Sequence, residues 1–99
     1  MLLIGISTYP QQSTKKAVDC MMKVPRLPDY IKSKGFYVYS TVDGMTSLAI
    51  YEFDGEKADE ALEKISAAYG RFHEVPGHSY QLMLCSKARE AAKRFLELS

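Results

Sequence analysis

The sequence predicts one α+β domain over residues 1–99, with a four-stranded antiparallel sheet and helices on one face. Two runs rich in β-branched and aromatic residues flank Asp43-Gly44, which is typical of a β-hairpin. Two further apolar runs alternate with a period of two residues, as strands do. Apolar residues between these runs recur at helical spacing. The elements are therefore expected in the order βαββαβ, with an additional C-terminal helix.

The first strand is expected over residues 2–9 and ends at Pro10, because proline has no N–H group for a sheet hydrogen bond. A helix follows over 14–24, with Ser13 as its expected N-cap. The hydroxyl of a serine at this position can accept a hydrogen bond from one of the unpaired N–H groups of the first helical turn. The start of the chain therefore predicts a strand that leads into a helix.

Two methionines, Met21 and Met22, lie on the apolar stripe of this helix. We interpret them as core filling, because the flexible thioether side chain suits irregular gaps; a ligand-contacting surface is the alternative. Two prolines in residues 25–34 interrupt the helical pattern. Residues 29–34 are expected to form one further turn before the hairpin.

The hairpin spans residues 35–53, and Asp43-Gly44 is expected to form its two-residue type I′ turn. Such a turn needs a positive φ at both central positions, which glycine adopts freely and aspartate at modest cost. This turn would pair Val42 with Met45 and so set the register of the two strands. Alternate side chains then point to opposite faces of the sheet.

A second helix is expected over residues 56–69, with Asp54 as its N-cap and Gly70 as the residue that ends it. Acidic residues in its first turn favour this placement, because the N-terminal end of a helix carries partial positive charge. Residues 71–79 are expected to be irregular, with a turn at Pro76-Gly77.

The fourth strand is expected over residues 80–85, where apolar and other side chains alternate. Ser86 can cap a last helix over 87–98. The apolar stripe of that helix consists of Ala88, Ala91, Ala92, Phe95 and Leu96. This helix lies outside the βαββαβ order, so the sequence alone does not say against which side of the domain it packs.

Neither face of the predicted sheet carries charge in its middle, so both faces need cover. We assign the more aliphatic face to the helices: Leu2, Ile4, Ile6, Tyr37, Tyr39, Leu48, Ile50, Tyr80, Leu82 and Leu84. The opposite face would then hold Gly5, Ser7, Tyr9, Phe36, Val38, Ser40, Ser47, Ala49, Tyr51, Gln81, Met83 and Cys85. That face is too apolar to stay bare, although tyrosine and serine also tolerate a half-wet face without a partner.

The composition is that of an ordinary globular domain, with 46% hydrophobic and 25% charged residues. A net charge of +1 argues against a general nucleic-acid or membrane-surface role. The cysteines, Cys20 and Cys85, show no CxxC spacing and lie among apolar residues. We interpret them as reduced core thiols of a cytoplasmic protein. No run is long enough to cross a bilayer.

The order βαββαβ is the ferredoxin-like pattern. Together with the two-sided sheet and the length, it resembles the dimeric α/β-barrel group of ferredoxin-like proteins. The resemblance implies that two sheets pack face to face and enclose a lumen. Members of that group include cofactor-independent monooxygenases, lactone isomerases, haem-binding enzymes and stress-responsive proteins, so the fold does not imply one activity. Small amino-acid-sensing regulatory domains share the order of elements and are the alternative.

Polar side chains on the face without helices are the candidate ligand-binding residues: Ser7, Tyr9, Ser40, Ser47, Tyr51 and Gln81. They could orient a small molecule among apolar walls, and dimer packing is the alternative. His78, just before the fourth strand, is the candidate general acid or base because imidazole titrates near neutral pH. His73 and His78 lack an identifiable third ligand, so no metal site is expected.

The sequence therefore predicts a cytoplasmic homodimer that packs through its open sheet face, with no motif that assigns an activity. One alternative is a monooxygenase-like or isomerase-like enzyme that holds a small hydrophobic substrate in the lumen, where His78 would move a proton. The other is a regulatory domain that senses a small metabolite. No cofactor, nucleic-acid partner or membrane partner is expected.

Overall fold

The computed structural model describes residues 1–98, without the side chains of Phe95, Glu97 and Leu98. Its elements are β1 (Leu2–Tyr9), α1 (Thr14–Lys23), β2 (Lys32–Thr41), β3 (Gly44–Glu52), α2 (Ala58–Gly70), β4 (Ser79–Cys85) and α3 (Ala88–Leu98). Short 3₁₀ turns occupy Gln11–Ser13, Gly55–Lys57 and Arg71–Glu74. The predicted place of Phe95 in the apolar stripe of the last helix lies outside the described side chains.

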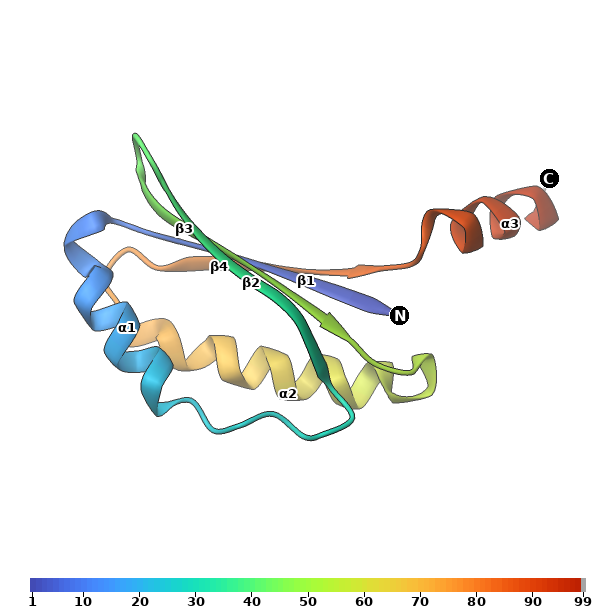
Figure 1. Ribbon diagram of the computed structural model, residues 1–99, viewed down its shortest axis with the longest axis horizontal. Coiled ribbons are helices and arrows are strands. Elements are labelled where there is room, and N and C mark those ends of the chain that lie inside the picture. Colours follow the sequence, from blue (N-terminus) through green and yellow to red (C-terminus); the bar gives the residue numbers. More distant parts are fainter. Residues whose placement is uncertain (99) are drawn as a thin grey trace.

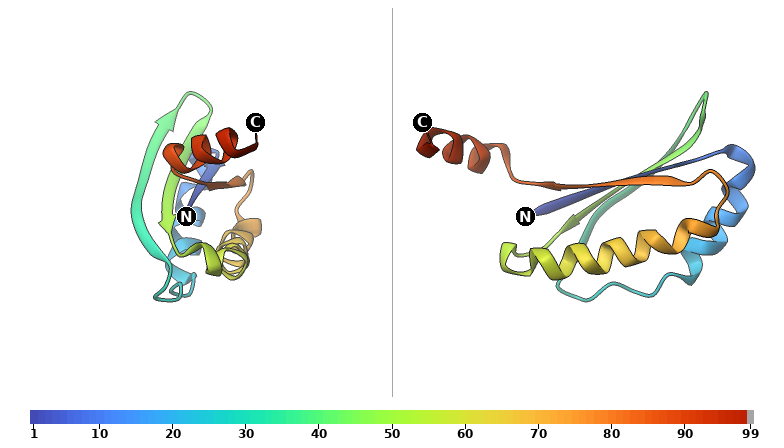
Figure 2. Two further views of the ribbon diagram at one scale, coloured as in Figure 1. Left: turned by 90° about the vertical axis from the view of Figure 1, so that its right-hand side faces the viewer. Right: turned by 180° about the vertical axis from the view of Figure 1, so that it is seen from behind.

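The four strands form one antiparallel sheet in the order β2-β3-β1-β4. Helices α1 and α2 lie against one face of this sheet, whereas α3 extends beyond the end of β4 (Figure 1; Figure 2). The order of the elements and the strands fits a ferredoxin-like α+β fold. No helix in the described part of the chain has both the length and the apolar character that a membrane span requires.

The hairpin between β2 and β3 turns one position earlier than predicted. Thr41 pairs with Gly44, so the turn residues are Val42 and Asp43. The expected type I′ turn at Asp43-Gly44 is wrong, because only glycines among the described residues have a positive φ. The pairing differs from the expected one by two residues, which is a full period of the strand. The side chains of β2 and β3 therefore still share faces as predicted.

The expected N-caps of α1 and α2 and the expected glycine end of α2 are not observed. Instead, 3₁₀ turns adjoin these three helix ends. The hydroxyl of Ser13 does not cap α1; it donates a hydrogen bond of 2.7 Å to the carbonyl oxygen of Pro76. Asp54 makes no side-chain cap to the turn at Gly55–Lys57 that precedes α2. Gly70 is the last residue of α2 with an ordinary helical φ of −61°, and the chain continues directly into Arg71–Glu74.

Two loop predictions had different outcomes. The turn at Pro76-Gly77 is confirmed, and Gly77 has a φ of +75° that favours glycine. The turn expected over residues 29–34 is present but shorter: the N–H of Ile31 donates to the carbonyl oxygen of Pro28 at 3.0 Å, and β2 already begins at Lys32. Its pairing with β3 is irregular between Ser33 and Gly35, as in a β-bulge.

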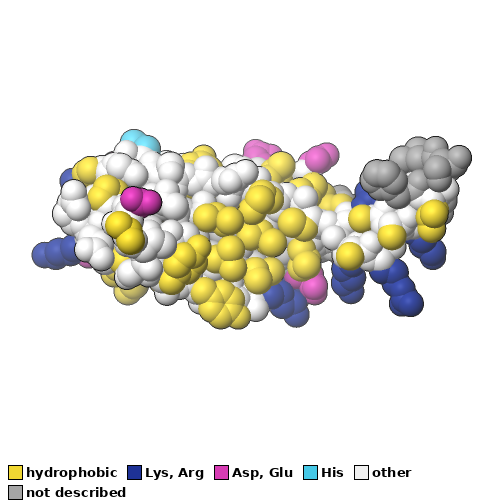
Figure 3. Space-filling view, turned by 90° about the horizontal axis from the view of Figure 1, so that it is seen from above, with side chains coloured by type: hydrophobic (Ala, Val, Ile, Leu, Met, Phe, Trp, Pro, Cys, Tyr) yellow, Lys and Arg dark blue, Asp and Glu magenta, His cyan; other side chains and the backbone are white. Residues whose placement is uncertain are grey.

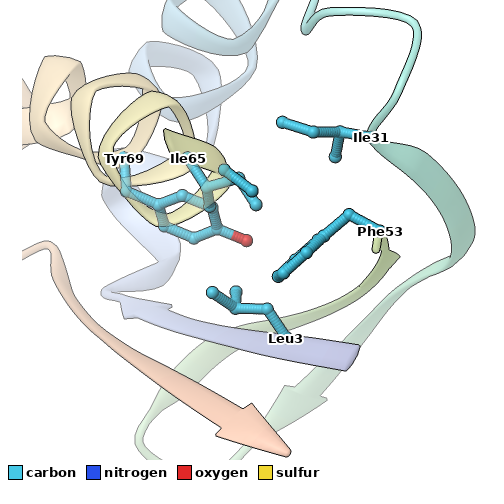
Figure 4. Packing of buried hydrophobic residues seen from close by; sticks show 6 residues of the cluster. Leu3, Ile31, Phe53, Ile65 and Tyr69 are labelled. Carbon is cyan, nitrogen blue, oxygen red and sulfur yellow. The ribbon is translucent and has the colours of Figure 1, made fainter. Parts of the chain in front are cut away.

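The helix-covered face of β1, β2 and β3 is the reverse of the predicted one. Leu3, Gly5 and Ser7 are buried beneath the helices. Tyr69 of α2 lies so close to the sheet that a Cβ at Gly5 would be 2.3 Å from the Tyr69 hydroxyl oxygen. At this point the large side chain comes from the helix and the sheet supplies a glycine beneath it. The core cluster is Leu3, Ile31, Phe53, Ala61, Ile65 and Tyr69 (Figure 4).

The face without helices is consequently the more aliphatic one. Cross-strand pairing and alternation place on it Leu2, Ile4, Ile6, Tyr37, Tyr39, Leu48, Ile50, Gln81, Met83 and Cys85. For β4 the predicted faces hold, because Tyr80 lies on the helix side, with its ring 5.5 Å from that of Tyr69. We call these ten residues the open face; Figure 3 shows a broad apolar patch on this side.

Candidate functional site

An apolar cavity lies under the sheet, on the helix-covered side of a single chain. The cavity is partly open to solvent and has a volume of about 380 Å³, which falls in the range of small-molecule sites. Its walls come from β1, β2, β3, α1, the end of α2 and the segment that follows α1. Among the described residues that line it, none is Asp, Glu, Lys or Arg. The cavity is therefore suited to an uncharged molecule.

Most of the predicted site residues line this cavity: Ser7, Tyr9, Ser47, Tyr51 and His78. They meet beneath the sheet of one chain, whereas the sequence led us to expect a lumen between two sheets. Ser40 and Gln81 are not among the lining residues. Ser40 is exposed near the hairpin and its hydroxyl donates to the sulfur of Met45 at 3.2 Å, and Gln81 belongs to the open face.

His78 is close to two aromatic rings. It stacks on Phe72 with ring centroids 5.1 Å apart, and its centroid is 5.9 Å from that of Tyr80. Burial lowers the pKa of His78, because a partly desolvated imidazole loses part of the hydration of its charged form. The neutral ring can donate one hydrogen bond and accept another. Its role as a general acid or base stays a prediction.

Two tyrosines at the far wall of the cavity share a hydrogen bond. The hydroxyl oxygens of Tyr51 and Tyr69 are 3.2 Å apart. Burial raises the pKa of both hydroxyls, and the shared hydrogen bond raises the pKa of Tyr69 further. Both phenols are therefore protonated at neutral pH, so they act as hydrogen-bonding groups rather than as bases.

The remaining candidate groups lie apart from the cavity. His73 is exposed, and its Nδ1 is 3.0 Å from the carbonyl oxygen of Gly70. Within the described residues, no three His, Cys, Asp or Glu side chains are grouped as a metal site would need. Both cysteines are free and half-buried. The thiol of Cys20 donates to the carbonyl oxygen of Arg71 at 3.3 Å, whereas Cys85 belongs to the open face.

Sequence reasoning missed the apolar walls of the cavity. Met21 lines it and Met22 is 78% exposed on the outer side of α1, so the interpretation of this pair as core filling is wrong. Phe36 and Val38 of β2 also line the cavity. The sequence did place both residues on one face, together with Ser47. It contained no signal that a cavity remains between that face and α1.

The lowered pKa of His78 predicts a pH dependence of stability. An unfolded histidine has a pKa of about 6.5, so below that pH the unfolded chain binds more protons than the folded one. Above this pH, the neutral ring makes its full contribution to the free energy of unfolding. That contribution is lost as the pH falls through the folded-state pKa. We expect the urea midpoint of His78→Phe, which keeps the ring stacking, to fall less between neutral and mildly acidic pH than that of the unmodified protein. If the urea midpoints of both proteins fell equally over this pH range, the prediction would be contradicted.

Comparisons with known proteins give no family for this chain. No family model matches it, and no curated protein matches it. The solved structures that are similar to this chain include three with low TM-scores. These are formyltetrahydrofolate deformylase from Burkholderia mallei (TM-score 0.42, 7% identity, 83% of this chain and 27% of that one), aminopeptidase PepT from Bacillus cereus (0.46, 12%, 97% and 34%) and a tripeptidase from Staphylococcus aureus (0.40, 11%, 99% and 35%). The chain spans about a third of the length of these proteins.

Proposed function

We propose that the chain is a homodimeric α+β module in which the open faces of two sheets pack against each other, as in a dimeric α/β barrel. The observation that carries the proposal is the aliphatic character of the helix-free face. In one chain, Ile4 has Ile50 and Met83 as its cross-strand neighbours on this face, and none of the three is fully buried. Contiguous apolar surface of this kind is typical of an interface.

The charges of the sheet support packing through this face. Lys34 and Glu52 form an ion pair of 3.8 Å at one end of it. The polar groups among the ten residues of the open face are Gln81 and the hydroxyls of Tyr37 and Tyr39, and Thr8 and Thr46 beside Tyr39 add only uncharged hydroxyls. Two copies could therefore meet without burying an unpaired charge.

The area of the face also supports a second copy. Four strands are about 19 Å wide and eight residues span about 26 Å, so the face measures about 500 Å². A stable interface buries about 800 Å² on each partner. Helix α3 projects from one end of the sheet and has an amphipathic sequence pattern, so we propose that it supplies the remaining area (Figure 1).

Light scattering coupled to size-exclusion chromatography tests the dimer. The unmodified protein is expected at about twice the chain mass of 11.2 kDa at micromolar concentration. Ile4→Lys places two like charges in the middle of the interface and is expected to yield a monomer that keeps its circular dichroism spectrum. Met22→Lys introduces the same charge on the outer side of α1 and is expected to leave the dimer intact.

Two results would contradict the homodimer. One is a monomeric mass for the unmodified protein at micromolar concentration. The other is a dimer that Met22→Lys dissociates and Ile4→Lys does not, which would move the interface to α1.

A further inference from the structure

The rim of the cavity exposes apolar side chains from two elements. Val18 and Met21 of α1 are 44% and 42% exposed, and Phe36 and Val38 of β2 are each 49% exposed. All four line the cavity. Apolar surface in contact with water is unfavourable, so a molecule seated between α1 and β2 would be held by burying them.

The deeper wall offers hydrogen-bonding groups without charge. Ser7 and Ser47 are cross-strand partners, and both line the cavity together with Tyr51 and His78. None of the described residues that line the cavity is Asp, Glu, Lys or Arg. A charged ligand would lose its hydration here without gaining a partner of opposite charge, which is costly. These walls therefore favour a neutral molecule that has at least one hydrogen-bonding group.

The chemistry of the remaining walls favours an aromatic ring. Phe36, Phe72 and Tyr69 contribute rings, and Met21 and Met45 contribute thioethers. Aromatic rings and thioether sulfurs both make favourable contacts with a flat aromatic partner. A volume of about 380 Å³ lies at the small end of ligand sites. The molecule that fits is therefore compact.

We propose that this cavity binds a small, neutral aromatic compound that carries a hydroxyl or carbonyl group. Its ring lies between α1 and β2, and its polar group faces Ser7, Ser47 and His78. The inference is separate from the homodimer, because the residues it uses lie on the helix-covered side of one chain. A monomer that binds the compound would disprove the dimer and leave this site standing.

The test compares two probes that share a naphthalene ring and differ in the charge and size of the substituent, 1-naphthol and 1-naphthalenesulfonate. Binding is followed by probe fluorescence and by the rise in melting temperature that a ligand of the folded state must cause. The expected result is saturable binding of 1-naphthol at micromolar concentration. The sulfonate is expected to bind at least about tenfold more weakly, because its charge has no partner.

Neighbouring residues on opposite faces provide matched variants. Ser47→Leu fills the cavity from β3 and is expected to weaken 1-naphthol binding about tenfold or more. Leu48→Ser changes the adjacent side chain on the open face and is expected to change binding by no more than about twofold. If Ser47→Leu does not fold, Ala68→Leu fills the same cavity from α2.

Three results would each overturn the proposal. The first is no saturable binding of 1-naphthol up to its solubility. The second is equal affinity for both probes, because the cavity would then not select a neutral ligand. The third is binding that Leu48→Ser abolishes while Ser47→Leu or Ala68→Leu leaves it unchanged, which would place the probe on the open face.

Discussion

Replacing Ile65 by alanine is expected to lower the free energy of unfolding by about 2–5 kcal/mol. Ile65 is fully buried on α2, in the cluster that also contains Leu3 and Tyr69 (Figure 4). Alanine would remove apolar contacts and leave a cavity that rigid neighbours cannot close. A domain of this size has a total stability of about 5–15 kcal/mol, so the loss is a large share of it. Urea unfolding at one fixed protein concentration measures the change.

Leu62 provides the matched control on the same helix. It lies three residues before Ile65 and is 37% exposed. Leu62→Ala is expected to cost about 1 kcal/mol or less, because water already reaches the side chain. If both substitutions were equally costly, the orientation of α2 on the sheet described here would be wrong.

Replacing Gly5 by alanine is expected to lower the free energy of unfolding by about 1–3 kcal/mol. The new Cβ would be 2.3 Å from the hydroxyl oxygen of Tyr69 and 2.7 Å from its Cζ. Either α2 or the tyrosine ring must move, and a ring movement would also disturb the hydrogen bond to Tyr51. Thermal and urea unfolding of the variant measure the loss.

Two further variants separate this steric effect from the general effect of replacing glycine. Gly70→Ala lies in helical backbone with no atom within 4 Å of the added Cβ, so it is expected to be neutral or stabilising by up to about 1 kcal/mol. Tyr69→Phe removes the atom nearest to the new Cβ. The loss in Gly5→Ala/Tyr69→Phe is therefore expected to be smaller than the sum of the two single losses. If the loss in the double variant equalled the sum of the two single losses, the ring of Tyr69 would not lie over Gly5.

The repeating patterns of the sequence were sufficient to predict the elements. Period-two alternation predicted four strands, and helical spacing predicted α1, α2 and α3. Local details were less predictable. The Asp43-Gly44 pair suggested the most favourable two-residue turn, but the chain turns at Val42-Asp43. Ser13 looked like an N-cap, but Pro76, far along the chain, provides a tertiary partner for its hydroxyl.

Five of the seven predicted site residues line one cavity, which lies under the sheet of a single chain, and their role in binding stays a prediction. Ser7, Ser47 and Tyr51 were grouped correctly, because alternation along antiparallel strands determines which side chains share a face. The contributions of α1 and of Phe72 were missed, since no local pattern reveals how closely a helix packs on a sheet. The location of the cavity therefore follows from helix packing and not from the strands.

By itself, the sequence determined the order of the elements, the alternation along each strand and the sets of side chains that share a face. Only the tertiary structure decided which of the two faces meets the helices. Alternation is symmetric between the faces, and the greater hydrophobicity of one face was a misleading guide. The decision depends on volume: the ring of Tyr69 on α2 packs over Gly5, where an added Cβ would have no room, and the aliphatic face is left open.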